Sequence, residues 1–286
     1  MKIFVTFASS SWRKAGARIV RQAKGLGAYD EVYGFDESNL GEAFRKRYRD
    51  KLVAGTRGFG YWCWKPQIIL QAMETLVEGD ILQYTDAGCH LNPAGLWRLK
   101  EYFERTVQSR TGILAFQAIA PTHPLPSLPC KPLDLMEYRW VKGDLLDHLG
   151  VRDDPMIVRT PTIGAGIIFI RKCDTANQLI KKWAAVVDDG FHFIDDTRSR
   201  APNLPGFVEH RHDQAIFSIL CKIHGVETLS AYEYWYPKKD GVTPDWVALQ
   251  NYPIHAKRDK GFGPRKVASK LKQIALALIG QKRYPE

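Results

Sequence analysis

Short apolar runs alternate along the chain with longer segments whose apolar residues recur every three or four positions. The short runs are rich in Ile, Val and Phe, which is typical of buried strands. The longer segments have the spacing of amphipathic helices. We predict strands in residues 2–7, 30–36, 80–85, 112–120 and 162–172, and helices in residues 13–24, 67–77, 96–107, 175–187 and 209–225.

Strands and helices that alternate over short links predict an α/β fold. We expect one Rossmann-like domain, residues 1–263, with a mixed but mostly parallel sheet flanked by helices. A chain of 286 residues with 45% hydrophobic and 25% charged residues can bury a sizeable core. Five prolines in residues 121–132 predict an irregular loop. The glycines do not form GxGxxG, so the dinucleotide fingerprint is absent.

Several protein classes are disfavoured by the composition. No run of 18 apolar residues is present, so no membrane-spanning helix is expected. The chain starts directly with an apolar strand and not with the three regions of an export signal. Its five cysteines lie far apart and form no CxxC pair, which disfavours both a zinc site and a disulfide framework. We therefore expect a cytoplasmic protein.

Positive charge is concentrated near the carboxyl end. Residues 257–286 contain nine Lys/Arg and two Asp/Glu, which accounts for +7 of the net charge of +10. Apolar residues recur at helical spacing in residues 264–283, so residues 264–286 form a basic amphipathic segment in which we expect a helix. Such a helix suits an anionic membrane surface, although a terminal helix packed on the domain explains the pattern nearly as well.

Three places carry candidate chemistry. Asp86 follows a buried strand, where an α/β sheet presents residues to a ligand, and Gly88 permits close approach of the backbone. A strand-ending turn explains these two residues equally simply. His255 precedes Lys257 and Arg258, which suits a metal ligand beside a diphosphate. The run EHRHDQ (209–214) begins the last long helix with more polar residues than capping requires.

Taken together, these segments resemble glycosyltransferases of the GT-A fold. The most specific stretches are RGFGYWCWKPQIIL (57–70), GDILQYTDAGCHLN (79–92) and HDQ (212–214). They are similar to bacterial enzymes of lipopolysaccharide and capsule gene clusters. The resemblance extends from about Phe4 to Lys260, and YWxWKP and HDQ are its distinctive motifs.

The resemblance implies roles for individual residues. Asp86 corresponds to the metal-binding Asp of an Asp-x-Asp element whose second Asp is replaced here by Gly88, and His255 corresponds to a late metal-ligating His. The metal would be Mn²⁺ or Mg²⁺, and the departure at Gly88 puts its necessity in question. Lys257 and Arg258 would contact the diphosphate. The other residues implied in donor binding are Phe7, Ala8, Ser9 and Lys65, and those implied at the reacting sugar are Asp213 and Gln214.

The function that the resemblance implies is transfer of a sugar from a nucleotide-sugar donor, such as a UDP-hexose, to a glycan or lipid-linked glycan. Charge on the leaving diphosphate would be stabilised by the metal and the basic residues, and Asp213 would face the oxocarbenium-like sugar. The Asp-Gln pair resembles that of retaining enzymes; an inverting enzyme would use Asp213 or Glu209 as general base.

Two other classes remain open from the residues. A nucleotidyltransferase also places carboxylates at strand ends, but it needs a glycine-rich phosphate loop that FASSSWRKAG (7–16) replaces poorly. A pI near 9.3 suggests a nucleic-acid-binding protein. The confinement of charge to one terminal segment and the absence of a binding motif argue against specific nucleic-acid recognition.

Overall fold

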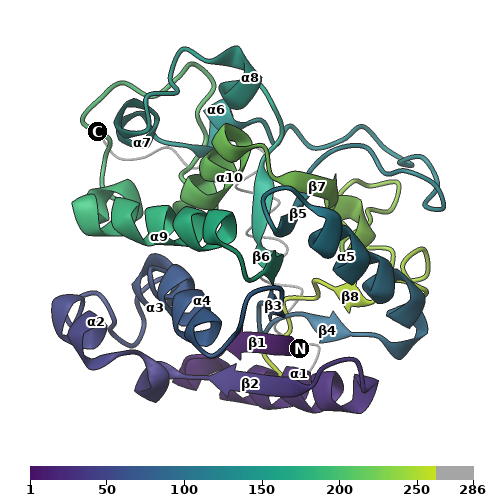
Figure 1. Ribbon diagram of the computed structural model, residues 1–286. Helices are drawn as coiled ribbons and strands as arrows, with labels where there is room; N and C mark the ends of the chain where they lie inside the picture. Colours follow the sequence, from purple (N-terminus) through teal and green to yellow (C-terminus); the bar gives the residue numbers. More distant parts are fainter. Residues whose placement is uncertain (262–286) are drawn as a thin grey trace.

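Six strands form one mixed sheet in the computed structural model, which describes residues 1–261 (Figure 1). Their order is β2-β1-β3-β6-β5-β7. β1 pairs in parallel with β2 and β3, and β5 with β7, whereas β6 is antiparallel to β3 and β5. The prediction of an α/β fold with a mixed, mostly parallel sheet is confirmed. The strands are β1 (Lys2–Phe7), β2 (Glu31–Phe35), β3 (Ile81–Thr85), β5 (Ile113–Gln117), β6 (Ile163–Arg171) and β7 (Glu227–Ser230).

Five helices of ten or more residues flank the sheet in the described part of the chain: α1 (Arg13–Leu26), α4 (Trp64–Glu74), α5 (Leu96–Gln108), α9 (Asp174–Asp189) and α10 (His212–His224). Shorter helices lie in the connections: α2 (Glu42–Arg47), α3 (Gly58–Tyr61), α6 (Glu137–Trp140), α7 (Gly143–His148) and α8 (Pro155–Val158). α4 begins three residues before the predicted start, because Pro66 is tolerated in the first turn, where its missing N–H leaves no bond unmade. α10 begins three residues later than predicted, at His212.

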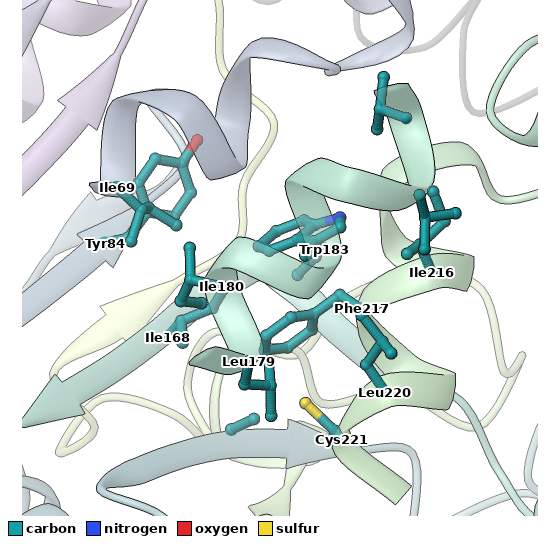
Figure 2. Packing of buried hydrophobic residues seen from close by; sticks show 14 of the residues in the cluster. Ile69, Tyr84, Ile168, Leu179, Ile180, Trp183, Ile216, Phe217, Leu220 and Cys221 are labelled. Atoms are coloured by element: carbon teal, nitrogen blue, oxygen red, sulfur yellow. The ribbon is translucent and has the colours of Figure 1, made fainter. Parts of the chain in front are cut away.

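Two hydrophobic layers hold the helices on opposite faces of the sheet. On one face α1 and α5 pack through Ala15, Ile19 and Tyr102 against alternate residues of the strands, such as Phe4 and Phe169. On the other face lie α4, α9 and α10 (Figure 1). Figure 2 shows the second layer, in which the rings of Trp183 and Phe217 lie 4.8 Å apart.

The chain reverses its direction across the sheet at β1. From β1 it passes through α1 to β2 on one side, and then through α4 to β3 on the other side. A crevice forms between two parallel strands where successive connections diverge in this way, and ligands of open α/β sheets bind there, at the carboxyl ends of the strands. In this chain that position lies beyond Phe7 and Thr85, where Asp86 follows.

Two expectations concern membranes. Within residues 1–261, no helix is long and apolar enough to cross a membrane. The predicted amphipathic helix in residues 264–283 lies outside the described residues, as does the boundary between residues 1–263 and 264–286.

Candidate active site

Asp86 lies directly beyond β3, at the crevice. Its backbone N–H donates to the Gly166 carbonyl of β6 at 2.8 Å, and its Oδ1 accepts a hydrogen bond from the Tyr84 hydroxyl at 2.8 Å. The side chain is 39% exposed. Asp86 is therefore a carboxylate that is fixed by the sheet and still open to solvent.

Two glycines of β6 make room for this arrangement. A Cβ at Gly166 would lie 2.9 Å from the Asp86 carboxylate, and a Cβ at Gly164 would lie 2.8 Å from the Tyr234 hydroxyl. These two glycines thus make room for side chains of the protein itself. Gly166 determines where the Asp86 carboxylate can lie.

Lys65 joins two carboxylates that are far apart in the sequence. From the first turn of α4, its Nζ lies 2.7 Å from Asp213 Oδ2 and 3.4 Å from Asp86 Oδ1, and it donates to the Ala165 carbonyl at 3.2 Å. The side chains of Lys65 and Asp213 are only 3% and 7% exposed. Asp86, Lys65 and Asp213 thus form one charged group, with Asp86 as its solvent-facing member.

Burial and pairing act in opposite directions on this group. Burial raises the pKa of Asp213 to about 6, against the lowering effect of Lys65. Burial also disfavours the ammonium of Lys65, but the attraction of Asp213 and Asp86 outweighs it, so the pKa of Lys65 is raised. Burial, followed by the nearby charge of Asp86, raises the pKa of the Tyr84 hydroxyl. At neutral pH Asp213 is thus mostly a carboxylate, Lys65 an ammonium and Tyr84 a neutral donor.

The predicted nucleotide-binding residues at the end of β1 are largely buried. The ring of Phe7 stacks on that of Trp64, with centroids 3.9 Å apart, and both belong to the core. Ala8 and Ser9 are each 8% exposed, and the Ser9 hydroxyl lies 3.3 Å from that of Ser11. All three predicted residues border the crevice, and their contact with a nucleotide stays a prediction.

Gln214 follows Asp213 in the first turn of α10. Among residues 1–261 its side chain makes no hydrogen bond, while its backbone N–H donates to the Arg211 carbonyl. The aromatic motif packs against the same turn, with the rings of Tyr61 and Trp62 lying 5.2 and 5.6 Å from that of His212. Tyr61 and Trp62 of the YWxWKP motif therefore pack against the first turn of α10. The Gln214 side-chain amide is available to a ligand.

The basic segment reaches the crevice through a second, two-stranded sheet. β4 (His90–Leu91) pairs with β8 (Ile254–His255), and beyond β8 the Asp259 N–H donates to the Gly88 carbonyl at 3.0 Å. The Asp259 carboxylate contacts both Arg18 and His90 at 3.0 Å. The Asp86 loop and the segment of residues 257–260 therefore lie next to each other.

The predicted ligands in this segment differ in their availability. His255 is 7% exposed and its Nε2 is bonded to the Leu249 carbonyl at 2.8 Å; burial lowers its pKa and keeps the ring neutral. Lys257 places its ammonium over the Trp246 ring at 5.3 Å. Arg258 is exposed and makes no hydrogen bond or ion pair within residues 1–261. Arg258 is thus the member most free to bind a ligand.

A preformed metal centre is not part of this arrangement. Within the described residues, no three or more His, Cys, Asp or Glu side chains come together in a group that could hold a metal ion. Metal binding by Asp86 and His255 stays a prediction.

Sequence reasoning missed two residues near the charged group. Arg211 lies over the Trp140 ring at 4.1 Å, with its Nε 3.5 Å from Glu209 Oε1. Arg211 belongs to the polar run 209–214 at the start of α10, and this run was the sequence pattern that could have identified it. Tyr234, whose hydroxyl approaches Gly164, follows β7 in a stretch without any distinguishing pattern.

Similarity to solved structures extends over most of the chain but is weak. Mouse xyloside xylosyltransferase 1, in its apo form, has 11% identity and a TM-score of 0.46, over 92% of this chain and 100% of that one. A glycosyltransferase involved in glycosylation of the major capsid of PBCV-1 has 11% identity and a TM-score of 0.43, over 95% and 98%. The galactosyltransferase LgtC, in complex with donor and acceptor sugar analogues, has 13% identity and a TM-score of 0.44, over 100% and 98%.

Sequence comparisons add no assignment. No protein-family model matches the chain, and no curated protein has a detectably similar sequence. With identities of 11 to 13% and TM-scores below 0.5, the three solved structures assign no role to any residue of this chain.

Proposed function

We propose that the protein is a glycosyltransferase that moves a sugar from a nucleotide-sugar donor to a hydroxyl of a glycan acceptor. The observation that carries the proposal is the Asp86–Lys65–Asp213 group at the crevice, next to the basic segment that contains Arg258. A nucleotide sugar has a diphosphate, which cations bind, and a sugar that becomes cationic during transfer, which carboxylates stabilise. Both kinds of charge are available within one site.

The proposed reaction breaks the bond between the anomeric carbon and the phosphate oxygen, whose electron pair leaves with the nucleoside diphosphate. The acceptor hydroxyl oxygen forms the new bond to that carbon, and its proton passes to the oxygen of the leaving diphosphate. Asp213, held as a carboxylate by Lys65 at 2.7 Å, acts on the developing positive charge of the sugar, while Gln214 binds sugar hydroxyls.

Retention of the anomeric configuration is part of the proposal. An inverting enzyme needs a carboxylate that removes the acceptor proton. Asp213 Oδ2 lies 2.7 Å from the buried Lys65 ammonium, and this pairing opposes the rise in pKa that burial causes, so the proposal gives Asp213 an electrostatic role. Nuclear magnetic resonance of the first product formed from an α-linked donor reports the configuration directly.

A divalent cation at this site was expected from the sequence, with Asp86 and His255 as its ligands and Gly88 able to offer only its backbone carbonyl. The Gly88 carbonyl accepts from Asp259, and His255 Nε2 is bonded to the Leu249 carbonyl. Asp86 alone is left, with the Lys65 ammonium 3.4 Å from its Oδ1. This set of ligands does not fit a divalent cation, so the proposed reaction has no step assigned to a metal.

The finer parts of the proposal are a UDP-hexose donor, a glycan or lipid-linked glycan acceptor in surface-polysaccharide synthesis, and peripheral attachment to an anionic membrane through residues 264–283. Co-sedimentation with anionic and neutral liposomes, for the full chain and for a chain ending at Gly263, tests the attachment. Equal sedimentation of the two chains would contradict it.

The central experiment is release of nucleoside diphosphate from a panel of UDP-, GDP-, CDP- and ADP-sugars by the purified full chain, with and without simple glycoside acceptors. We expect release with at least one donor, and its loss in Asp86→Ala. Asp50→Ala is the matched control, because Asp50 is an exposed carboxylate outside the crevice. No release with any donor, or equal release by the Asp86 variant, would refute the proposed site.

A further inference from the structure

Gly88 lies in close packing, where a side chain would crowd its neighbours. A Cβ there would lie 3.2 Å from Arg258 Cα and 3.2 Å from the Trp12 ring. The Gly88 carbonyl is meanwhile held by the Asp259 N–H at 3.0 Å. The backbone of Arg258 and Asp259 therefore packs directly on the strand-end loop, in the place where a second carboxylate of an Asp-x-Asp element would begin.

The same packing brings the Arg258 charge to the crevice. The positive charge of Arg258 acts on Cys89 and Tyr234, and the negative charge of Asp86 acts on the same two groups. Arg258 is exposed, and the structure gives it no hydrogen bond or ion pair within residues 1–261. Its guanidinium donors therefore have no protein partner within residues 1–261, and its charge acts on the same groups as the charge of Asp86.

Arg211 supplies a second positive charge in the same neighbourhood. Burial lowers its pKa to about 10, and repulsion from Arg258 and Arg57 acts in the same direction, opposed by Glu209. The one carboxylate that it contacts is Glu209, at 3.5 Å, among the residues that the structure describes. The charge of Arg258 acts unfavourably on that of Arg211, and an anion that binds to both would relieve this repulsion.

We propose that Arg258 and Arg211 bind the diphosphate of the donor in place of a divalent cation. This inference rests on the proposed function, and it assigns the leaving-group charge to two guanidinium groups. Each guanidinium presents planar pairs of N–H donors that match phosphate oxygens and remains charged at neutral pH. Nucleoside diphosphate then binds with metal removed, and its affinity depends on both arginines.

Isothermal titration calorimetry of the full chain tests the inference with UDP, GDP, CDP and ADP, and with the corresponding nucleosides. Titrations are made in EDTA and in millimolar Mg²⁺ or Mn²⁺. We expect binding of at least one diphosphate in EDTA, with little gain on adding metal. Arg258→Ala and Arg211→Ala are each expected to weaken it about 10- to 100-fold, as for a lost charged hydrogen bond, without weakening nucleoside binding.

Arg45→Ala is the matched control, because Arg45 is an exposed arginine of α2 and the variant removes the same charge. Arg211 packs on Trp140, so its variant is compared only if its melting temperature is within a few degrees of wild type; the exposed Arg258 tests the inference in either case. Binding that requires metal, or binding in EDTA that neither arginine variant weakens, overturns the inference and leaves the glycosyltransferase proposal standing. If no diphosphate binds under either condition, the proposed function fails as well.

Discussion

Lys65 is the residue whose replacement tests the charged group most directly. In Lys65→Met, the two carboxylates lose the ammonium that lies 2.7 Å from Asp213 and 3.4 Å from Asp86. Removal of one partner of a buried ion pair costs about 3–5 kcal/mol of unfolding free energy, because the other charge stays buried. In a chain of this size 1 kcal/mol corresponds to about 2 °C, so we expect the melting temperature to fall by about 6–10 °C at pH 8.

The loss of stability in Lys65→Met depends on pH, and the pKa of Asp213 sets the direction of this dependence. Its pKa is raised in the folded protein to about 6 from an ordinary value of 3.8, so the stability linked to its proton is complete below pH 3.8 and is lost as the pH rises through 6. Without Lys65, the opposing effect disappears and this pKa rises further. At pH 5 Asp213 is mostly protonated in both proteins, so the variant loses less stability there than at pH 8.

Calorimetric melting of wild type and Lys65→Met at pH 5 and pH 8 measures both quantities. Lys100→Met is the control, since Lys100 is 78% exposed on α5. In addition, Lys65→Met combined with Asp213→Asn is expected to be more stable at pH 8 than Lys65→Met alone, because no unpaired buried carboxylate remains at position 213. Equal losses at the two pH values, or a loss no larger than that of the control, would refute a buried pair between Lys65 and Asp213.

Three other variants separate catalysis from folding. Asp86→Ala is expected to abolish sugar transfer with a change in melting temperature of a few degrees at most, because the carboxylate is 39% exposed; near-wild-type transfer by a folded variant would contradict this. Asp213→Asn is expected to lower kcat about 100-fold with little change in donor affinity. The wild-type protein is expected to lose activity as the pH falls through about 6, and this loss is expected to be absent in the variant. An unchanged pH profile in the variant would assign the loss to another group. Gly166→Ala places a Cβ 2.9 Å from the Asp86 carboxylate and is expected to lower kcat at least tenfold by displacing it, at nearly unchanged stability; unaltered kcat would show that the position of this carboxylate is not critical.

Five of the six strands of the main sheet were predictable because each carries a local pattern, whereas the four-residue strand β7 was not predicted. Residues 2–7 and 162–172 were predicted as strands and are observed as β1 and β6, shifted by no more than one residue at either end. The direction of β6 was not predictable, because its antiparallel pairing with β3 and β5 depends on where the intervening chain returns to the sheet. The two-residue strands β4 and β8 are too short to have a recognisable period.

The candidate site shows the same division between local and distant information. Asp86, Asp213 and Lys65 were each singled out from short motifs, but the ion pair of Lys65 with Asp213 joins residues 148 positions apart, which no local pattern reports. The importance of Gly88 was likewise attributed to close approach of a ligand. What approaches it is the backbone of Arg258, and that contact becomes evident only in three dimensions.

The pairing of β4 with β8 has a consequence for the order in which the protein matures during synthesis. All six strands of the main sheet are complete once the ribosome has added Ser230, and domains fold as units, beginning from the amino end. Arg258 and Asp259 are added after that point and reach Gly88 only when β8 has closed onto β4. A nascent chain can therefore contain all six strands of the main sheet before the proposed diphosphate site exists, so that this site is completed in one of the last steps of folding.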